Sequence, residues 1–285
     1  MTGGGSVRPY IDCHNHIGQT IDRVPKVGQN TNMCLARFAE TGIYAAISAP
    51  TAVGSPITRG IEDLRHQNEV IGRAIQDFPG RFPVGLALIE SRFGDLGIEE
   101  AEKAMGDYGL CGLMGHPPIG PWCIPFVEVA AARDGLVNLH MHNPLMVDIA
   151  EMFPHTQFIC HASSYAMEHL ARFDNIWFEV VQYPDGQGTE WDFNLAADKL
   201  GSDRLIFGAD LPYYDYRVLQ KTIEEAKVSD ELKDKIAYKN VIPLIQKYNP
   251  SWTLPDDPVK QHRIWDPEEL WAGDPKNPVR LTVLS

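Results

Sequence analysis

Basic residues are scarce in this sequence. Its 285 residues include 25 Lys and Arg against 38 Asp and Glu, so the formal net charge at pH 7 is −13. Proteins that bind nucleic acids or anionic membrane surfaces favour basic patches. The composition therefore argues against both kinds of partner, and we expect the chain to bind a small molecule instead.

Long apolar runs and paired cysteines are also missing. No stretch reaches the roughly 18 apolar residues of a membrane span. The first nine residues, MTGGGSVRP, contain no apolar region of a signal peptide. The five cysteines are odd in number and form no CxxC pair, which argues against a disulfide framework. We therefore expect a cytoplasmic protein.

Short apolar runs, by contrast, are frequent and regularly spaced. The eight runs that we predict to be strands are 9–14, 43–49, 82–89, 110–115, 136–142, 156–161, 176–181 and 204–210. Helical patterns lie between most of them, at 62–78, 97–107, 123–133, 163–172, 189–200 and 213–227. Strands that alternate with helices pair in parallel through right-handed crossovers. Eight such units in about 240 residues predict a single-domain α/β fold, a (β/α)8 TIM barrel over residues 9–248. An open doubly wound sheet is the structural alternative.

The segment 249–285 differs in composition from the rest of the chain. It is rich in Pro, Asp and Trp and has no clear periodicity. Trp252, Trp265 and Trp271 would be exposed in a free tail, which is unfavourable for side chains of this size. We therefore predict a C-terminal arm that wraps the barrel or a neighbouring subunit. We also predict a homo-oligomer, by preference a dimer, with the arm at or near the contact.

The strongest chemical signal is the pair His14 and His16, which follows Asp12 in the first expected strand. Residues two apart on a strand face the same side. Two imidazoles on one side at the end of a barrel strand can bind one divalent metal ion. Asp12 is expected to orient the loop or support the ligands. Taken alone, such a pair can equally be two surface histidines on a turn.

Three later strands also end in residues that bind metals or move protons. His140 and His142 end one expected strand, His161 ends the next, and Asp210 follows the last. In TIM barrels the catalytic groups gather at the C-terminal ends of the strands. Four strands that each supply His or Asp at one level predict a metal centre at that end of the barrel.

This order of motifs resembles the amidohydrolase superfamily. The DxHxH start (12–16), the histidines of the fifth and sixth expected strands, and FGADLP (207–212) match its pattern. RFPVGL (81–86) and GLCGL (109–113) support the amidohydrolase-related branch, also called amidohydrolase 2. That branch includes hydrolases, lactonases and non-oxidative decarboxylases similar to aminocarboxymuconate-semialdehyde decarboxylase. The resemblance spans roughly residues 9 to 248 and implies a metal-dependent enzyme.

The resemblance also implies roles for individual residues. It makes four residues metal ligands, which are His14, His16, His140 and Asp210. His142 then lies further out, near substrate, although the opposite assignment of His140 and His142 stays open. His161 corresponds to a histidine that in this branch is catalytic more often than ligating. Asp210 corresponds to an aspartate that both binds metal and handles protons.

One departure from the superfamily pattern concerns the number of metal ions. Related binuclear enzymes bridge two ions through a lysine or glutamate of the fourth strand, where this chain has Met114. Without that bridge we expect one divalent ion per chain. Zinc suits three histidines and a carboxylate, with manganese and iron as alternatives. His116, in the same segment, is expected either to face substrate or to pack before Pro117.

Two reactions fit such a centre. The preferred one is hydrolysis of a small amide, lactone or related carbonyl compound by a metal-activated water. Asp210 would carry the proton and His161 would donate a hydrogen bond to the developing oxyanion. The compact chain favours this reaction, because the related decarboxylases tend to carry longer loop insertions.

The alternative reaction is non-oxidative decarboxylation of an aromatic or unsaturated carboxylic acid at the same metal site. It would favour a cation for the carboxylate and an aromatic wall. The candidates, each of which can equally be a surface or packing residue, are Arg23, Arg59, Arg92, Trp122, Tyr183, Tyr213 and Tyr214. A metal-binding protein without catalysis is a third hypothesis, which bound metal without turnover would favour.

Overall fold

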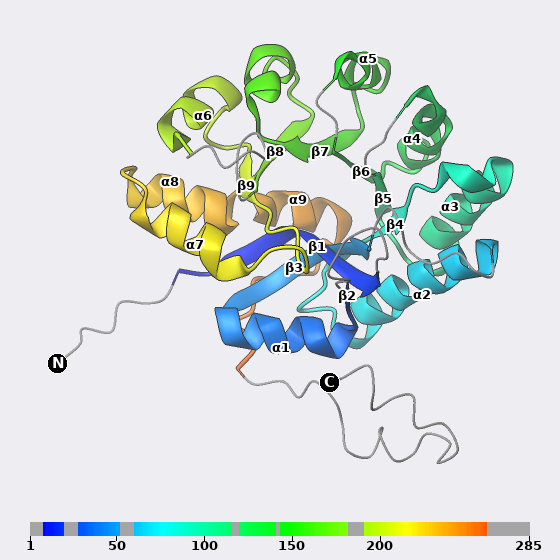
Figure 1. Ribbon diagram of the computed structural model, residues 1–285, viewed down its shortest axis with the longest axis horizontal. Coiled ribbons are helices and arrows are strands. Elements are labelled where there is room, and N and C mark those ends of the chain that lie inside the picture. The colour runs from blue at the N-terminus through cyan, green and yellow to red at the C-terminus, as the bar shows by residue number, and fades with distance from the viewer. Residues whose placement is uncertain are drawn as a thin grey trace.

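The computed structural model describes residues 8–19, 28–51, 60–115, 120–140, 143–181 and 191–260. Within these ranges nine strands form one sheet in the order β2-β1-β3-β4-β5-β6-β7-β8-β9. Neighbouring strands from β1 to β9 are parallel, and only β2 pairs antiparallel. Helices surround the curved sheet (Figure 1). The chain therefore has the predicted TIM-barrel architecture.

All eight predicted strands are present. They are β1 (Tyr10–Gln19), β3 (Ile43–Pro50), β4 (Val84–Leu88), β5 (Gly112–Gly115), β6 (Leu136–Leu139), β7 (Gln157–His161), β8 (Ile176–Val180) and β9 (Leu205–Phe207). The short strand β2 (Gly28–Gln29) pairs with the end of β1, which runs further than predicted. Strand β6 is shorter than predicted and ends directly before His140.

The helices follow the strands as predicted, with several additions. The described helices are α1 (Thr31–Thr41), α2 (Ile61–Asp77), α3 (Asp95–Asp107), α4 (Ile124–Ala131), α5 (Pro144–Met152), α6 (Phe193–Leu200), α7 (Tyr216–Glu225), α8 (Asp230–Asp234) and α9 (Val241–Tyr248). The stretch predicted as a helix at 163–172 contains the π-helical turn η3 (Ala166–Leu170). None of the helices in these ranges is long and apolar enough to cross a membrane.

Helices α1 and α5 were not predicted, and each begins at a side-chain cap. The Asn30 side chain accepts a hydrogen bond from the backbone N–H of Met33 at the start of α1. The Asn143 side chain accepts one from Leu145, and Pro144 occupies the first turn of α5. Proline fits that position because its missing N–H would have no partner inside the helix. Asn-Pro thus begins a helix here.

The core has two layers, as expected for a TIM barrel. The larger one lies between the strands and the surrounding helices. The smaller one fills the barrel itself with residues such as Leu86, Leu136 and Ile206, and α9 packs against it through Val241 and Leu244. In Figure 1 α9 lies behind the strands. One end of the barrel is therefore plugged by apolar side chains, and chemistry is confined to the other end.

The beginning of the arm packs on the same core. Trp252 is buried in the inner layer, and its indole N–H donates a hydrogen bond to the Gly80 carbonyl at 3.1 Å. Arg81 donates to the Asp257 carbonyl at 2.8 Å. Residues 249–260 therefore wrap the barrel of their own chain, whereas 261–285, with Trp265 and Trp271, lie outside the described residues.

The first and last strands meet through the chain that follows β9. Asn15 forms an isolated parallel bridge with Leu211, and the His16 N–H donates to the Leu211 carbonyl at 2.9 Å. These contacts bring the loop after β9 onto the middle of β1, so the barrel is nearly closed.

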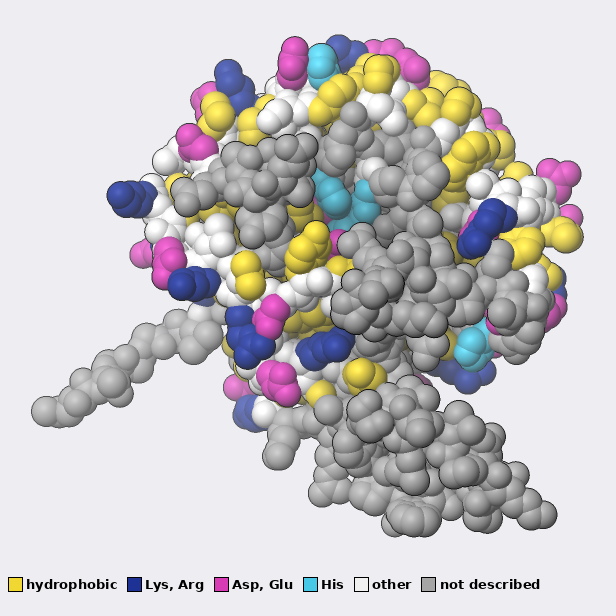
Figure 2. Space-filling model, viewed as in Figure 1, with side chains coloured by type: hydrophobic (Ala, Val, Ile, Leu, Met, Phe, Trp, Pro, Cys, Tyr) yellow, Lys and Arg dark blue, Asp and Glu magenta, His cyan; other side chains and the backbone are white. Residues whose placement is uncertain are grey.

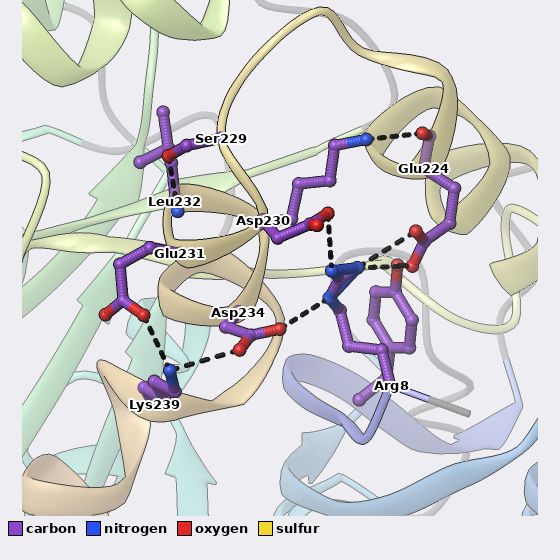
Figure 3. A network of polar contacts seen from close by, with 10 residues as sticks. Arg8, Glu224, Ser229, Asp230, Glu231, Leu232, Asp234 and Lys239 are labelled. Atoms are coloured by element: carbon purple, nitrogen blue, oxygen red, sulfur yellow. Dashed lines mark hydrogen bonds and ion pairs between the residues drawn. The ribbon is translucent and has the colours of Figure 1, made fainter. Parts of the chain in front are cut away.

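A charged cluster ties the start of β1 to the last helices (Figure 3). The Arg8 guanidinium lies 2.8 Å from Asp234, 2.9 Å from Glu224 and 3.4 Å from Asp230. The Tyr10 hydroxyl donates to the same Glu224 carboxylate at 2.7 Å. Only 13% of the Arg8 side chain is exposed, so solvent screens these contacts less than it screens ordinary surface pairs.

Candidate metal centre

His14 and His16 lie side by side inside the barrel, as predicted from their spacing. Both are buried on β1, and their Nε2 atoms are 3.0 Å apart. Asp210 reaches them from the loop after β9, where its Oδ1 atom lies 3.3 Å from each Nε2. Figure 2 shows histidine side chains at the centre of the face seen in Figure 1. Residues far apart in sequence thus form one group of donors.

This group fits a divalent metal ion. Three atoms with these separations share a point about 2 Å from each of them, which is the length of a metal–nitrogen or metal–carboxylate bond. The second ring nitrogen of each histidine is oriented by an acceptor. His16 Nδ1 lies 3.0 Å from the Pro50 carbonyl, and His14 Nδ1 lies 3.2 Å from Glu179 Oε1. Such acceptors hold the Nδ1–H tautomer and direct the Nε2 lone pairs toward a metal.

Asp210 has an unusual backbone conformation. Its φ is 55°, in the left-handed region that few residues other than glycine adopt, although Asp and Asn tolerate it best. This turn aims the carboxylate back at β1. It leaves 16% of the side chain exposed at the mouth of the barrel.

Asp12 connects the first strand to the chain that follows the last strand. Its Oδ1 accepts hydrogen bonds from the backbone N–H groups of His14 and Ala209, both at 2.9 Å. Burial raises the pKa of this carboxyl to about 6, against the effect of those hydrogen bonds. Asp12 therefore supports the loop that carries Asp210, as the sequence suggested.

Glu179 is the functional residue that the sequence analysis missed. It lies fully buried on β8, and its Oε1 is 3.2 Å from His14 Nδ1, 3.3 Å from His140 Nε2 and 3.0 Å from His161 Nε2. These four residues also form a group that could hold a metal ion, and the group shares His14 with the first one.

A signal for Glu179 was present in the sequence. The run IWFEVV contains one acid among apolar residues, and side chains alternate between the two faces of a barrel strand. Phe178 and Val180 pack outward against the helix layer, while Trp177 packs against the inner layer. The same alternation places Glu179 inside the barrel, where a lone carboxylate needs partners.

His140 and His161 lie next to each other, and both contact Glu179. The His140 ring is 4.2 Å from the His14 ring and 4.3 Å from the His161 ring, measured between centroids. His140 is buried, whereas 21% of the His161 side chain is exposed. His140 thus lies in the group around Glu179 and not in the group of His14, His16 and Asp210, and His161 is accessible from the mouth.

The electrostatics of the centre favour neutral imidazoles and charged carboxylates. Burial lowers the pKa of His16, and burial together with the neighbouring His14 lowers that of His140 much further. Burial opposes ionisation of Asp210 and Glu179, but the surrounding imidazoles outweigh it. The pKa of Asp210 is held at about 2, and that of Glu179 lies well below its usual range. Metals bind ionised carboxylates and neutral imidazoles.

His14 is the exception. Burial opposes its protonation, but Glu179 and Asp210 outweigh that effect and raise the pKa of His14 to about 9. The two carboxylates therefore favour a proton on His14, which offsets part of their charge. A bound divalent ion would take over this role.

Of the other residues predicted for the site, the structure describes some and not the rest. The Tyr213 ring lies 5.9 Å from the His16 ring, at the mouth of the barrel. Arg92 is paired with Glu90, and Trp122 and Tyr214 are exposed. The remaining predicted residues, which lie outside the described ranges, are Arg23, Arg59, His116, His142 and Tyr183.

Met114 is buried on β5 and belongs to the apolar layer inside the barrel. No described residue of β5 belongs to either group of potential metal donors.

Comparison with known proteins gives the same fold and a family. A family model described as amidohydrolase matches residues 11–242. Among curated proteins, none matches the sequence. Solved structures do match it at low identity, which shows the shared fold.

Several of these structures are decarboxylases. The 5-carboxyvanillate decarboxylase of Sphingomonas paucimobilis has 13% identity and a TM-score of 0.67, covering 84% of this chain and 99% of that one. The 2,6-dihydroxybenzoate decarboxylase of Rhizobium has 16% identity and a TM-score of 0.66, covering 85% and 99%. A dihydroxybenzoic acid decarboxylase of Polaromonas with bound manganese has 15% identity and a TM-score of 0.64, covering 84% and 97%.

Proposed function

The chain belongs to the amidohydrolase family, and we propose that it is a metal-dependent, non-oxidative decarboxylase of an aromatic or unsaturated carboxylic acid. The observation that carries the proposal is the position of His161. Its imidazole is accessible from the mouth, and Glu179 beside it gives it a carboxylate partner. A proton donor next to a metal centre is what protonation of a substrate carbon requires.

The sequence alone favoured hydrolysis over decarboxylation, because the chain is compact. Our proposal reverses this preference. Several of the solved structures similar to this chain are decarboxylases of hydroxylated aromatic acids, and they favour the second reaction. A chain that covers nearly the full length of those enzymes also weakens the argument from missing loop insertions.

The residues suited to hold the metal are His14, His16 and Asp210, with a further ligand from His140 or His142. A bound divalent ion would bind the oxygens of the substrate and withdraw electron density from the carboxylate and its neighbouring phenolate. One ion per chain is proposed, because β5 offers no bridge. Manganese, as in the Polaromonas enzyme, and zinc are both candidates.

His161 would transfer its proton to the carbon that bears the carboxylate. The bond between that carbon and the carboxylate then breaks, CO₂ leaves, and its electron pair restores the ring or double bond. His161 afterwards takes a proton from solvent at the mouth. Tyr213 lies where it can form a wall for the substrate ring. For the substrate we also propose contacts with His116, His142 and Arg59.

Deuterium incorporation tests this proposal. The metal-loaded protein is incubated in D₂O with a panel of ortho-hydroxylated benzoic acids, and CO₂ release and the NMR spectrum of the product are followed. We expect one deuterium at the carbon that lost its carboxylate. His161→Asn should retain the metal but react about 10²–10⁴-fold more slowly, the usual effect of losing a general acid.

Hydrolysis remains the second candidate, because Asp210 is the carboxylate of the centre that is open to the mouth. In that reaction it would take a proton from the water that attacks a carbonyl carbon. Turnover of lactones or amides, with none of the acids in the panel, would replace the decarboxylase proposal by this one.

We also propose a cellular compartment and an oligomeric state for the enzyme. All five cysteines are free, which suits a reducing compartment such as the cytoplasm. We further propose a homo-oligomer with the arm at or near the contact.

A further inference from the structure

Glu179 has a place in the site that neither the sequence nor the family assignment explains. A single oxygen, Oε1, lies between the Nδ1 atom of His14 and the Nε2 atoms of His140 and His161, at 3.2, 3.3 and 3.0 Å. Among the residues that the structure describes, only these imidazoles form ion pairs with Glu179. Its buried charge is therefore matched by the histidines of the centre, while the Cys13 thiol lies 3.7 Å from its other oxygen, Oε2.

We propose that Glu179 is a positioning residue that orients His14 as a metal ligand and His161 as the proton donor. The second role rests on the proposed function. The first needs only that the centre binds a metal. Glu179 itself would touch neither the metal nor the substrate.

The number of lone pairs on Oε1 of Glu179 limits how many histidines this oxygen can orient. A carboxylate oxygen accepts about two hydrogen bonds, yet three ring nitrogens surround Oε1. The two shorter distances are those to His161 and His14. The contact of Glu179 with the Nδ1 side of His14 leaves the Nε2 atom of His14 facing His16 and Asp210, where the metal would lie. With Nε2–H facing Glu179 at 3.0 Å, Nδ1 is the nitrogen that would take up a second proton from solvent and pass it to substrate.

The fold prevents Glu179 from moving away from this position. Its backbone carbonyl accepts a hydrogen bond from Ala162 at 2.9 Å, and it pairs with His161 on β7 and with Ile206 on β9. On the other side, a Cβ atom at Gly208 would lie 3.0 Å from Glu179 Oε2 and 3.2 Å from the Cβ of His14. The glycine thus allows β9 to approach closely and confine the carboxylate.

The test compares Glu179→Gln with the native protein, and it does not depend on knowing the substrate. Zinc affinity is measured by competition with a chelating dye. The tautomer of His161 is read from its ¹⁵N chemical shifts in the zinc-loaded protein. Glutamine has nearly the same shape, but its amide can donate as well as accept, so it does not impose one tautomer.

We expect zinc affinity to fall about 10–100-fold, as for other groups that orient metal-binding histidines. We also expect the single Nε2–H tautomer of His161 to be lost. The control is Glu100→Gln, because Glu100 is an equally buried carboxylate that accepts from Asn68 and Arg65 on the outside of the barrel. It should leave both quantities unchanged.

Two results would overturn the proposal. One is native zinc affinity together with a native His161 tautomer in Glu179→Gln. The other is a second zinc equivalent in the native protein that Glu179→Gln loses, since Glu179 would then be a ligand. If Glu179→Gln does not fold, Glu179→Asp replaces it, because it keeps the charge but is one methylene too short to reach both histidines. A negative decarboxylation panel would remove the proposed function without changing either measurement.

Discussion

At the scale of single residues, the centre depends on which ring nitrogen of each histidine faces inward. His16 is turned by a backbone carbonyl and His14 by a carboxylate, and both then present Nε2 to Asp210. Neither acceptor is near its histidine in sequence. The orientation of the ligands is therefore a property of the assembled barrel.

The first prediction concerns these two ligands. His14→Ala and His16→Ala should each lose most of the bound metal, because each removes one of three donors that lie about 2 Å from a common point. Elemental analysis after removal of loosely bound metal measures the loss, and the native protein should contain close to one equivalent. His169→Ala, which removes a half-exposed histidine, is the control. Full occupancy in both ligand variants would show that the pair is structural.

The second prediction separates the two roles of Asp210. Asparagine tolerates the left-handed backbone at φ 55° and can offer one oxygen to a metal, but it cannot carry a proton at neutral pH. In the proposed decarboxylation Asp210 only binds metal, so Asp210→Asn should keep the fold and regain most of its activity at saturating metal; in hydrolysis it would stay about 10²–10⁴-fold slower. Thermal unfolding and turnover at saturating metal check both parts. Recovery of full activity with added metal would make Asp210 a ligand only.

The third prediction concerns Gly208, which lies against Glu179 and His14. Gly208→Ala places a methyl group 3.0–3.2 Å from both residues, so one of them must shift by a few tenths of an ångström. We expect zinc affinity to fall roughly tenfold or more. Gly80→Ala meets no atom within 4 Å and should bind zinc normally. Equal affinity in both variants would mean that the packing around Glu179 can adapt.

At the scale of elements, the first strand, β1, contributes both to the candidate metal centre and to the closure of the barrel. It supplies two donors, pairs with β3, and accepts the loop after β9 through Asn15 and His16. Few hydrogen bonds connect β1 directly to β9. The bridge of Asn15 with Leu211 and the contacts of Asp12 therefore connect the two ends of the sheet, and the cluster around Arg8 ties β1 to α7 and α8.

The fourth prediction tests this connection. Arg8→Ala removes three ion pairs at once from a side chain that is only 13% exposed. We expect it to lower the free energy of unfolding by about 1–3 kcal/mol. Arg172→Ala, which removes a single exposed pair with Glu151, should cost less than about 1 kcal/mol. Urea denaturation of both variants gives the comparison, and equal losses would show that the Arg8 cluster has no special role.

At the scale of the whole molecule, the two ends of the barrel have different tasks. One end is plugged by α9 and Trp252, which pack on the apolar layer inside the strands. The other end carries the polar centre. The same division of stability and chemistry between the two ends is usual for TIM barrels. Because Trp252 is used in the plug, the tryptophans of the arm that we propose for a contact with another subunit are Trp265 and Trp271, which lie outside the described residues.

The fifth prediction concerns that contact. We expect the full chain to sediment as a dimer at micromolar concentration, because tryptophan is enriched in interfaces. Removal of residues 261–285 should give a monomer that still binds zinc, since 249–260 and the plug remain in place. A monomeric full-length chain would contradict this prediction.

Much of the fold was predictable because it depends on local patterns. Eight short apolar runs separated by helical segments require a parallel sheet, and their number and spacing favour closure. Helix α5 was not predicted, because Asn143-Pro144 is a turn signal and also a good helix start. Only the packing of Met146 and Ile149 onto the outer layer decides between them.

The sequence by itself predicted the barrel, His14, His16 and Asp210 as potential metal donors at one of its ends, and a strand without a donor at Met114. Each follows from residue type and from the alternation of side chains along one strand. Only the tertiary structure decided how the donors divide into two groups, and that Glu179 lies where these groups meet. The reason is physical: which side chain faces which ring nitrogen depends on the stagger of neighbouring strands, and that stagger is set by the closure of the whole sheet.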